Sequence, residues 1–259
     1  MNKLSVVLAT YNEEKNIGKC LKSVKGLAGE IVVVDGGSVD KTCEIARRYG
    51  ARVKVTSNPA MFHINKQKAI DMAKCDWILQ LDADEAVTKE LKDEISNIVG
   101  DESGDFVAYN ISRRNYFLGR EMKKTGMYPD CVIRLFKKGK AYLACKSVHE
   151  QMKVDGRMGF LKNDLDHYPY PCFSEYLLKS NRYTSLTAME YEKEELGLDR
   201  ITRFKYMCVY PVGRFLELFF RHKGFMDGYA GYVFSLYSGL HIKTSYIKYW
   251  EIVKKRSKK

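Results

Sequence analysis

The stretch EIVVVDGGSVDKT, residues 30–42, decides the fold class of this chain. Its β-branched run Glu30–Val34 predicts a buried strand, the two glycines predict a tight turn, and Asp40 is placed to cap a helix that starts at Lys41. Turn geometry leaves Asp35 unexplained, and a carboxylate there can accept hydrogen bonds from a nucleobase or a ribose. The stretch is neither a GxGxxG dinucleotide fingerprint nor a P-loop.

The same order of strand, polar turn and helix repeats on both sides of this stretch. Leu4–Ala9 and Trp77–Leu81 are apolar runs of strand length. Helical spacing is found over Glu14–Val24, Lys41–Tyr49 and Ile64–Ala73. This alternation predicts an α/β fold with a parallel sheet, whose ligands bind outside the carboxyl ends of the strands.

The rest of the chain predicts a different organisation. The later elements are an acidic helix over residues 86–100, mixed or antiparallel strands at Phe106–Ile111 and Val132–Phe136, and a long helix from about Ser174 to Leu196. With 259 residues, 45% of them hydrophobic, the chain is long enough for one large α/β domain with an appendage. We expect a ligand-binding, catalytic domain over residues 1–165 and a helical C-terminal region over residues 166–259.

Positive charge is concentrated near the C-terminus. The formal net charge is +12, and residues 201–259 hold twelve Lys and Arg against three Asp and Glu, a balance of +9. Tyr, Phe and Leu interleave these cations, which suits an anionic membrane surface. Nucleic acid would accept the same charge, but no nucleic-acid-binding motif is present, and we expect no such partner. Phe225–Ile242 comes closest to a membrane span, yet Asp227 and several glycines interrupt it, so helices lying in the interface are expected.

The cysteines and the N-terminus indicate the compartment. Seven widely spaced cysteines without a CxxC pair indicate neither a zinc site nor a disulfide framework, and we expect small core residues in a reducing compartment. The apolar stretch Leu4–Ala9 is too short for the core of a signal peptide. The expectation is a cytoplasmic protein, peripherally associated with the inner face of the cell membrane.

Polar clusters follow each of the three predicted strands of the first part, at Thr10–Glu13, Asp35–Ser38 and Asp82–Glu85. The sharpest is Asp82-Ala83-Asp84, because two carboxylates at the end of a buried strand are costly unless a cation or a polar ligand compensates them. Mg²⁺ and Mn²⁺ prefer oxygen ligands and bridge diphosphate oxygens. The alternative is a solvated turn in which Asp84 or Glu85 caps the next helix.

Three motifs, in this order and spacing, resemble family 2 glycosyltransferases of the GT-A fold. They are ATYNEE at 9–14, VVVDGGSVDKT at 32–42 and WILQLDADE at 77–85. The resemblance covers roughly the first 160 residues. It implies a Rossmann-like mixed sheet flanked by helices that binds a nucleotide sugar, followed here by a helical, membrane-associating appendage.

The resemblance also implies a role for each motif residue. Thr10, Tyr11 and Glu13 would line the nucleotide pocket, and Asp35 would read the uracil or ribose. Asp84 would bind the metal, Mn²⁺ or Mg²⁺, and Asp82 would face the ribose and also contribute to the metal site. The donor would be a UDP-sugar. Either Lys66 or Lys68 would approach the diphosphate, the alternative being surface lysines on an amphipathic helix.

The element VHEQ at 148–151 resembles a His-Glu motif of the lipopolysaccharide-core β-glucosyltransferase branch of that family. Glu150 is therefore the candidate general base. Arg134 precedes it as in that branch and would steady the diphosphate or an anionic acceptor, the alternative being an ordinary salt bridge. His149 or His167 would complete the metal shell unless it is merely packed or hydrogen-bonded. The tail resembles the same branch more loosely.

The reaction implied is a single displacement at the anomeric carbon with inversion, onto a lipid-linked or lipopolysaccharide-core-type saccharide at the membrane surface. Glu150 would take the proton of the acceptor hydroxyl. Two other hypotheses stay open. A sugar nucleotidyltransferase also uses metal and nucleotide, although ATYNEE lacks the glycine-rich loop with a basic residue that such enzymes usually show. The other is a non-catalytic membrane-surface binding module.

Overall fold

The computed structural model describes residues 3–59, 61–101, 104–145 and 151–256. The chain forms two compact units. The N-terminal unit comprises Met1–Arg114 and Asp130–His167, and the C-terminal unit comprises Asn115–Pro129 and Tyr168–Lys259. Each unit has its own buried cluster of side chains.

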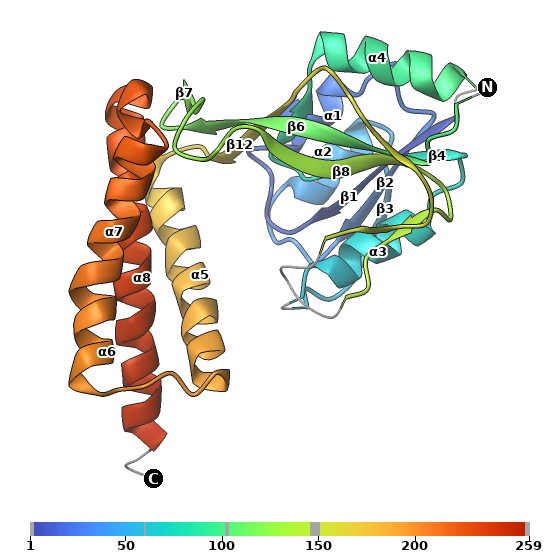
Figure 1. The fold of residues 1–259 in the computed structure, drawn as a ribbon. Helices are drawn as coiled ribbons and strands as arrows, with labels where there is room; N and C mark the ends of the chain where they lie inside the picture. Colours follow the sequence, from blue (N-terminus) through green and yellow to red (C-terminus); the bar gives the residue numbers. More distant parts are fainter. Residues whose placement is uncertain (1–2, 60, 102–103, 146–150, 257–259) are drawn as a thin grey trace. The chain divides into compact units, whose positions relative to one another are not determined.

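A mixed sheet forms the centre of the N-terminal unit (Figure 1). Strand β1 (Leu4–Thr10) lies between β2 (Glu30–Asp35) and β4 (Trp77–Leu81), and both pair with it in parallel. The strand order is β3-β2-β1-β4-β8-β6-β12-β5. The remaining members are β3 (Arg52–Val55), β8 (Asp130–Lys137), β6 (Ala108–Phe117), β12 (Leu165–Tyr170) and β5 (Glu85–Val87). The sheet becomes mixed at β8, which runs antiparallel to β4 and to β6.

Short strands complete the pairing. The strands β11 (Met158–Phe160) and β7 (Arg120–Glu121) both pair with β6, and β9 (Ala141–Tyr142) pairs with β10 (Lys153–Val154). Strand β6 extends past the boundary between the units, so β7 pairs with its last residues inside the C-terminal unit.

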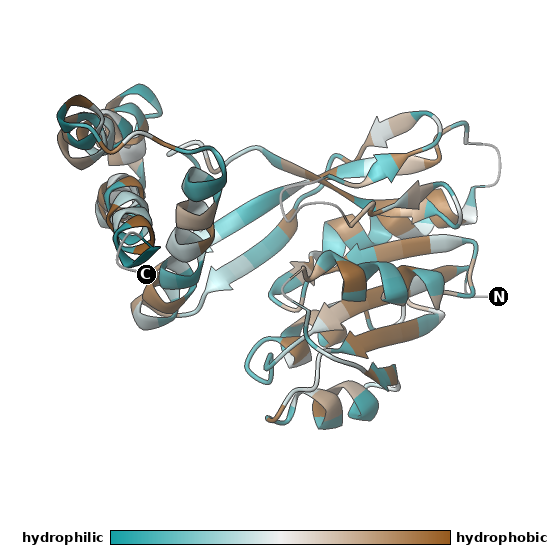
Figure 2. Ribbon diagram, turned by 90° about the horizontal axis from the view of Figure 1, so that it is seen from below, coloured by the Kyte–Doolittle hydropathy of each residue, from teal (hydrophilic) through white to brown (hydrophobic). Residues whose placement is uncertain are grey.

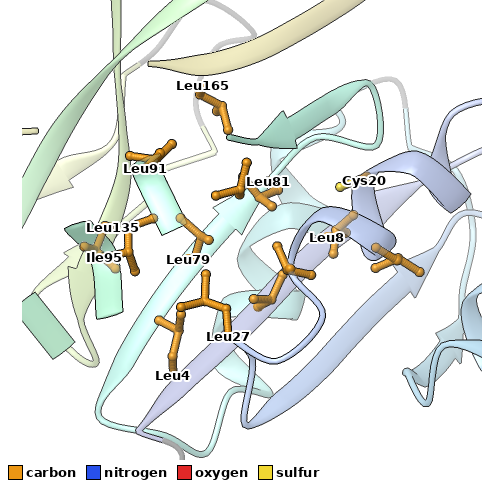
Figure 3. Close-up of a cluster of buried hydrophobic side chains, with 14 of the residues drawn as sticks. Leu4, Leu8, Cys20, Leu27, Leu79, Leu81, Leu91, Ile95, Leu135 and Leu165 are labelled. Atoms are coloured by element: carbon orange, nitrogen blue, oxygen red, sulfur yellow. The ribbon is translucent and has the colours of Figure 1, made fainter. Parts of the chain in front are cut away.

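The two faces of the sheet are covered by different helices, because alternate strand residues point to opposite sides. Leu4, Val6 and Leu8 of β1 join one buried cluster and Val7 joins the other. Helices α1 (Ile17–Ser23), α2 (Thr42–Arg48) and α4 (Lys89–Gly100) cover the first face, and α3 (His63–Asp71) covers the second. Figure 3 shows the first cluster, where leucines of β1 and β4 meet side chains from α1 and α4.

The C-terminal unit is helical. Its elements are α5 (Phe173–Lys193), α6 (Arg200–Phe204), the π-helical turn η1 (Lys205–Val209), α7 (Tyr210–Leu216), the π-helical turn η2 (Glu217–Arg221), the 3₁₀ turn η3 (Gly224–Asp227) and α8 (Gly228–Arg256). Helix α8 packs against α5 and α7. Hydrophobic and hydrophilic residues mix along these helices (Figure 2). Among the described residues, none of the helices combines the length and the apolar character that crossing a membrane requires.

The fold class predicted from the sequence is confirmed, and the three strands of the first part lie where they were expected. The sequence analysis named runs that correspond to β1, β2, β4, β6 and β8, and it missed the remaining strands β3, β5, β7, β9, β10, β11 and β12. The helix predicted over residues 86–100 begins only at Lys89, because Glu85–Val87 pairs with β12 instead. The expectation that the cysteines are core residues holds for Cys20 and is wrong for Cys131, Cys172 and Cys208, which are exposed.

Candidate functional site

The three polar clusters lie at one edge of the sheet. Thr10 of β1 pairs with Asp35 of β2, and Leu8 of β1 pairs with Leu81 of β4. Neighbouring strands lie about 4.8 Å apart, so the ends of β2 and β4, on the two sides of β1, are separated by about 10 Å. Because all three strands are parallel, Thr10, Asp35 and Asp82 leave the sheet at this edge.

Asp35 is buried and its carboxylate organises the turn that follows β2. One oxygen accepts hydrogen bonds from the Thr10 hydroxyl (2.8 Å) and the Ser38 hydroxyl (2.7 Å). The other accepts from the backbone amides of Gly37 (3.0 Å) and Ser38 (2.7 Å). Burial on its own would raise the pKa of Asp35, but the hydrogen bonds from Ser38 and Thr10 outweigh it and lower the pKa below the usual value. The geometry therefore supplies a structural reason for a carboxylate here.

The loops after β1 and β2 are tied to each other. The amide of Asn12 donates to the Ser38 hydroxyl (2.7 Å), and its side-chain oxygen accepts from the amide of Val39 (2.9 Å). The amide of Glu13 donates to the Thr42 hydroxyl (2.7 Å). Tyr11 lies on this frame with 45% of its surface exposed. The structure thus brings Thr10, Tyr11, Glu13 and Asp35 together, and leaves the Tyr11 ring accessible to a ligand.

Asp82 is held between two cations. Its Oδ1 lies 2.5 Å from Lys66 Nζ, and its Oδ2 lies 2.6 Å from Arg134 Nη2. Burial alone would raise the pKa of Asp82, but the charges of Arg134 and Lys66 outweigh it and hold the pKa well below the ordinary value. Three residues distant in the sequence, from the β4 end, α3 and β8, therefore form one charged cluster.

Glu85 and Gln80 complete this cluster. The sequence analysis named Glu85 only in the polar turn after the third strand or as a helix cap, and it gave Gln80 no role. The Glu85 carboxylate is fully buried; it lies 2.7 Å from Arg134 Nη2 and 3.3 Å from Arg113 Nη1, and it accepts the amide of Asp82 (2.9 Å). Arg134 also donates to the side-chain oxygen of Gln80. Gln80 is the one polar residue inside the buried strand WILQL. A polar side chain in such a strand needs a partner, so the sequence could have indicated that Gln80 belongs to a polar cluster.

The Asp82–Glu85 turn does not cap the next helix, so that alternative is wrong. Thr88 caps α4 instead, with its hydroxyl accepting the amide of Leu91 (3.2 Å).

Lys66 and Lys68 were left as alternatives, and the structure places them differently. Lys66 lies at Asp82 with its side chain 12% exposed. Lys68 Nζ donates instead to the Thr56 hydroxyl (3.3 Å) and the side-chain oxygen of Asn65 (3.3 Å). Lys66 is therefore the lysine that joins the charged cluster.

Asp84 points toward His167. The two side chains are mostly buried and approach to 3.7 Å between Oδ1 and Nε2. Burial lowers the pKa of His167, although the charge of Asp84 acts in the opposite direction. A carboxylate and an imidazole with this separation fit a divalent cation that takes its other ligands from diphosphate and water. Among residues 3–59, 61–101, 104–145 and 151–256, no group of three or more His, Cys, Asp or Glu side chains is arranged to hold a metal by itself.

A pocket of about 160 Å³ opens beside the charged cluster, on the face of the sheet that α3 covers. Its lining residues are His63, Lys66, Gln80, Asn110, Cys131, Val132, Ile133, Arg134, Leu143, Gln151 and Met152. Charged, amide and imidazole groups thus share the wall with aliphatic side chains. A polyhydroxylated ligand could hydrogen-bond there and still pack a carbon face. The proposed base Glu150 and metal ligand His149 lie outside the described residues.

Comparison with known proteins agrees with this architecture. An α/β fold whose polar side chains gather at the carboxyl ends of parallel strands is typical of nucleotide-binding proteins. Residues 5–168 match the family described as glycosyl transferase family 2. The chain belongs to this family, and the resemblance seen in the three motifs is confirmed.

Relatives and solved structures are similar over most of the chain. An uncharacterized glycosyltransferase of Rickettsia typhi is 30% identical over 248 residues, covering 91% of this chain and 82% of that protein. The lipopolysaccharide core biosynthesis glycosyltransferase LpsC of Rhizobium meliloti is 28% identical over 236 residues, covering 89% and 85%. The structure of S. aureus TarS 1-349 in complex with UDP aligns with a TM-score of 0.50 and 18% identity, covering 86% of this chain and 74% of that one, and it supports the GT-A fold.

Proposed function

We propose that this glycosyltransferase moves a hexose from a UDP-sugar, with inversion, onto a lipid-linked or lipopolysaccharide-core-type saccharide at the inner membrane surface. The observation that carries the proposal is the meeting of Asp82 with Lys66 and Arg134 at the carboxyl ends of β1, β2 and β4. Two cations held by one carboxylate are preorganised to receive the diphosphate of a donor.

The donor part of the proposal rests on the strand-end loops. Tyr11, exposed on the loop after β1, offers a ring to the base, and Thr10 and Glu13 shape the loop around it. Both carboxylate oxygens of Asp35 accept hydrogen bonds within the turn. In this proposal Asp35 therefore recognises the uracil or ribose in one of two ways. Either it gives up one of these hydrogen bonds to accept one from the ligand, or it positions the Gly37 and Ser38 backbone that contacts the ligand. The UDP bound in the similarly folded TarS supports uridine as the base.

The family implies a divalent metal, and Asp84 fits it best in the described part of the chain. Asp84 would hold Mn²⁺ or Mg²⁺, joined by His149 or His167, whereas Asp82 was also expected from the sequence to be a ligand. When bound, the ion neutralises charge on the departing diphosphate. Both oxygens of Asp82 already face cations, so Asp82 is better suited to hold Lys66 and Arg134 in place. These two side chains donate hydrogen bonds to the diphosphate and stabilise the negative charge that develops on it.

The acceptor step is assigned to the segment that follows β9. Glu150 would take the proton from the acceptor hydroxyl as that oxygen attacks the anomeric carbon from the face opposite the leaving diphosphate, which inverts the configuration. The neighbouring pocket, with Asn110, Gln151 and His63 in its wall, suits a sugar ring. Similarity to LpsC supports a saccharide acceptor of the lipopolysaccharide core. The basic C-terminal region would keep the enzyme at the cytoplasmic face of the membrane, where such acceptors are found.

Product analysis tests this function against the alternatives. The purified chain is incubated with a UDP-sugar, Mn²⁺ and a lipopolysaccharide-core acceptor, and we expect UDP with a product of inverted anomeric configuration by NMR. Glu150→Gln should still bind UDP and should lose turnover by about a hundredfold or more, whereas Glu90→Gln, on the exposed side of α4, should keep it. Release of pyrophosphate would instead establish nucleotidyl transfer, and full activity of Glu150→Gln would remove that residue from its role.

A further inference from the structure

One continuous helical segment, from Arg200 to Arg221, carries apolar side chains on its outer face. It is formed by α6, η1, α7 and η2 in direct succession. We call the following exposed residues the apolar stripe: Ile201, Phe204, Cys208, Val212, Leu216 and Phe220. The five large hydrophobic residues among them are each between 46% and 68% exposed. Isolated exposed residues are ordinary, but a row of six on one helical segment requires an explanation.

The stripe is distinct from the side of the segment that packs into the unit. Tyr206 and Met207 join the buried cluster around Tyr246, and Leu218 is buried. The backbone oxygen of Pro211 lies where a Cβ on Gly239 would meet it at 2.4 Å, so α7 and α8 are in close contact there. The segment is therefore already anchored through its inner side, and the stripe is not part of the core.

The two π-helical turns keep the stripe on one face. From Phe204 onward its members are four residues apart, and in a regular α-helix of 3.6 residues per turn each such step would rotate the side chain by about 40°. A π-helical turn contains more residues than an α-helical turn, so a step of four residues through η1 or η2 rotates the side chain in the opposite direction. The two π-helical turns thus offset the rotation that accumulates in the α-helical parts. Pro211, which lacks an amide hydrogen, lies just after η1 and fits an interruption of the α-helical pattern there. The irregular backbone thus has the effect of aligning apolar side chains.

The positive charge around the apolar stripe indicates which kind of partner can cover it. Residues 200–223 contain six Lys and Arg against one acidic residue, Glu217. Glu217 is itself paired with Arg214 at 2.8 Å. A second copy of the chain docked by the same face would bring two positive surfaces together, which is unfavourable. An anionic bilayer supplies both a negative surface and an apolar layer a few ångströms below it.

We propose that the apolar stripe on residues 200–221 is the membrane-docking face of the enzyme, inserted between the headgroups of anionic phospholipids with the flanking Arg and Lys at the phosphates. This inference rests on the proposed function, because it names the surface through which the enzyme reaches a membrane-bound acceptor. Binding requires both components, the exposed rings for insertion and the cations for attraction.

Vesicle flotation with a matched pair of variants tests the inference. Phe204→Ser with Phe220→Ser removes two stripe residues that are 61% and 58% exposed, and Leu178→Ser with Met189→Ser removes two residues of α5 that are 71% and 50% exposed. The wild-type chain should bind phosphatidylcholine vesicles that contain phosphatidylglycerol and should not bind pure phosphatidylcholine. The stripe variant should bind about tenfold more weakly or worse. The control variant should bind as the wild type does.

Thiol footprinting tests the same face without any substitution. Cys208 belongs to the stripe, while Cys172 is exposed elsewhere in the same unit. Alkylation of each cysteine is followed by mass spectrometry with and without anionic vesicles. The vesicles should slow modification of Cys208 severalfold and leave Cys172 unchanged.

Three outcomes would overturn the inference: equal binding by the stripe variant and the wild type, equal modification of Cys208 with and without vesicles, or a dimer that the stripe substitutions dissociate. Failure of the proposed function would look different. Release of UDP from a soluble UDP-sugar should persist in the stripe variant, since the strand-end cluster is untouched. A wild-type chain that releases no UDP but docks through the stripe would refute the enzymatic proposal alone.

Discussion

At the scale of single residues, the site depends on carboxylates that hold cations. Asp82 engages Lys66 and Arg134, and Glu85 engages Arg134 and Arg113. Arg134 stays charged in this buried position because Asp82 and Glu85 raise its pKa against the effect of burial. Its Nε has no hydrogen-bond partner among the described residues, so its orientation relies on the contacts of Nη1 and Nη2. A buried cation fixed in this way needs no reorganisation when a diphosphate arrives.

The two lysines of α3 provide a matched test of diphosphate recognition. Lys66→Met should weaken UDP binding about 10- to 100-fold, the range expected for one charge-assisted hydrogen bond. Lys68→Met should change it by less than about threefold, because Lys68 binds Thr56 and Asn65 instead. Titration calorimetry with UDP measures both. A larger loss in Lys68→Met than in Lys66→Met would contradict the assignment.

Glu85 is a positioning residue, and its substitution should first lower the free energy of unfolding. Glu85→Gln removes a fully buried negative charge that two guanidinium groups share, and breaking a buried pair costs on the order of 3 kcal/mol. Asp155→Asn is the control, since the Lys140–Asp155 pair (3.2 Å) is exposed and should contribute less than about 1 kcal/mol. Urea denaturation of both variants gives the comparison. If Glu85→Gln and Asp155→Asn both lowered the free energy of unfolding by the same small amount, Glu85 would not be holding Arg134 and Arg113 in place.

The lowered pKa of Asp35 predicts how stability depends on pH. Its folded pKa is below the unfolded value of about 3.9, so the unfolded chain binds more protons in acid. The stabilisation is fully present above the unfolded pKa and is lost as the pH falls through the folded pKa. The unfolding free energy of the wild type should therefore decrease more steeply below about pH 5 than that of Asp35→Asn. If the unfolding free energies of the wild type and of Asp35→Asn changed in parallel with pH, Asp35 would not contribute to the pH dependence of stability.

At the scale of elements, the close packing of α8 against α7 depends on Gly239. A Cβ at Gly239 of α8 would meet the Pro211 backbone oxygen at 2.4 Å, whereas a Cβ at Gly213 of α7 would meet nothing within 4 Å. Gly239→Ala should therefore destabilise the fold by about 1–3 kcal/mol through overpacking. Gly213→Ala should stabilise it by about 0.5–1 kcal/mol, because alanine is the better helix former. Thermal melting ranks the variants, and a lower melting temperature for Gly213→Ala than for Gly239→Ala would refute this packing.

Local sequence signals explain which elements could be predicted. The strands β1, β2 and β4 are runs of β-branched and aliphatic residues that are buried on both faces, so their composition indicates them directly. Strand β3 is a short edge strand with charged Arg52 and Lys54, which hides its character. Strand β5 has three residues and exists because β12 pairs with it, a contact that its own sequence does not encode.

The same limit applies to the site. Asp82, Lys66 and Arg134 were each predicted as functional residues from motif positions, but their mutual ion pairs depend on how α3 and β8 pack beside β4. The ion pair between Glu85 and Arg113 was missed, because it depends on β12 lying between β5 and β6 in the sheet. The roles of Thr10, Tyr11, Glu13 and Asp84, like the division of labour between residues 1–165 and 166–259, stay predictions.

At the scale of the whole molecule, family membership and the residues at the strand ends lead to one central claim: Asp84 and the diphosphate of the donor share a divalent cation. Titration calorimetry of UDP into the wild-type chain, with Mn²⁺ and with EDTA, tests it directly. We expect Mn²⁺ to tighten UDP binding about tenfold or more. Asp84→Asn should lose this gain, and Asp93→Asn, on the exposed side of α4, should keep it. Equal UDP affinity with Mn²⁺ and with EDTA, or an undiminished gain in Asp84→Asn, would contradict the claim.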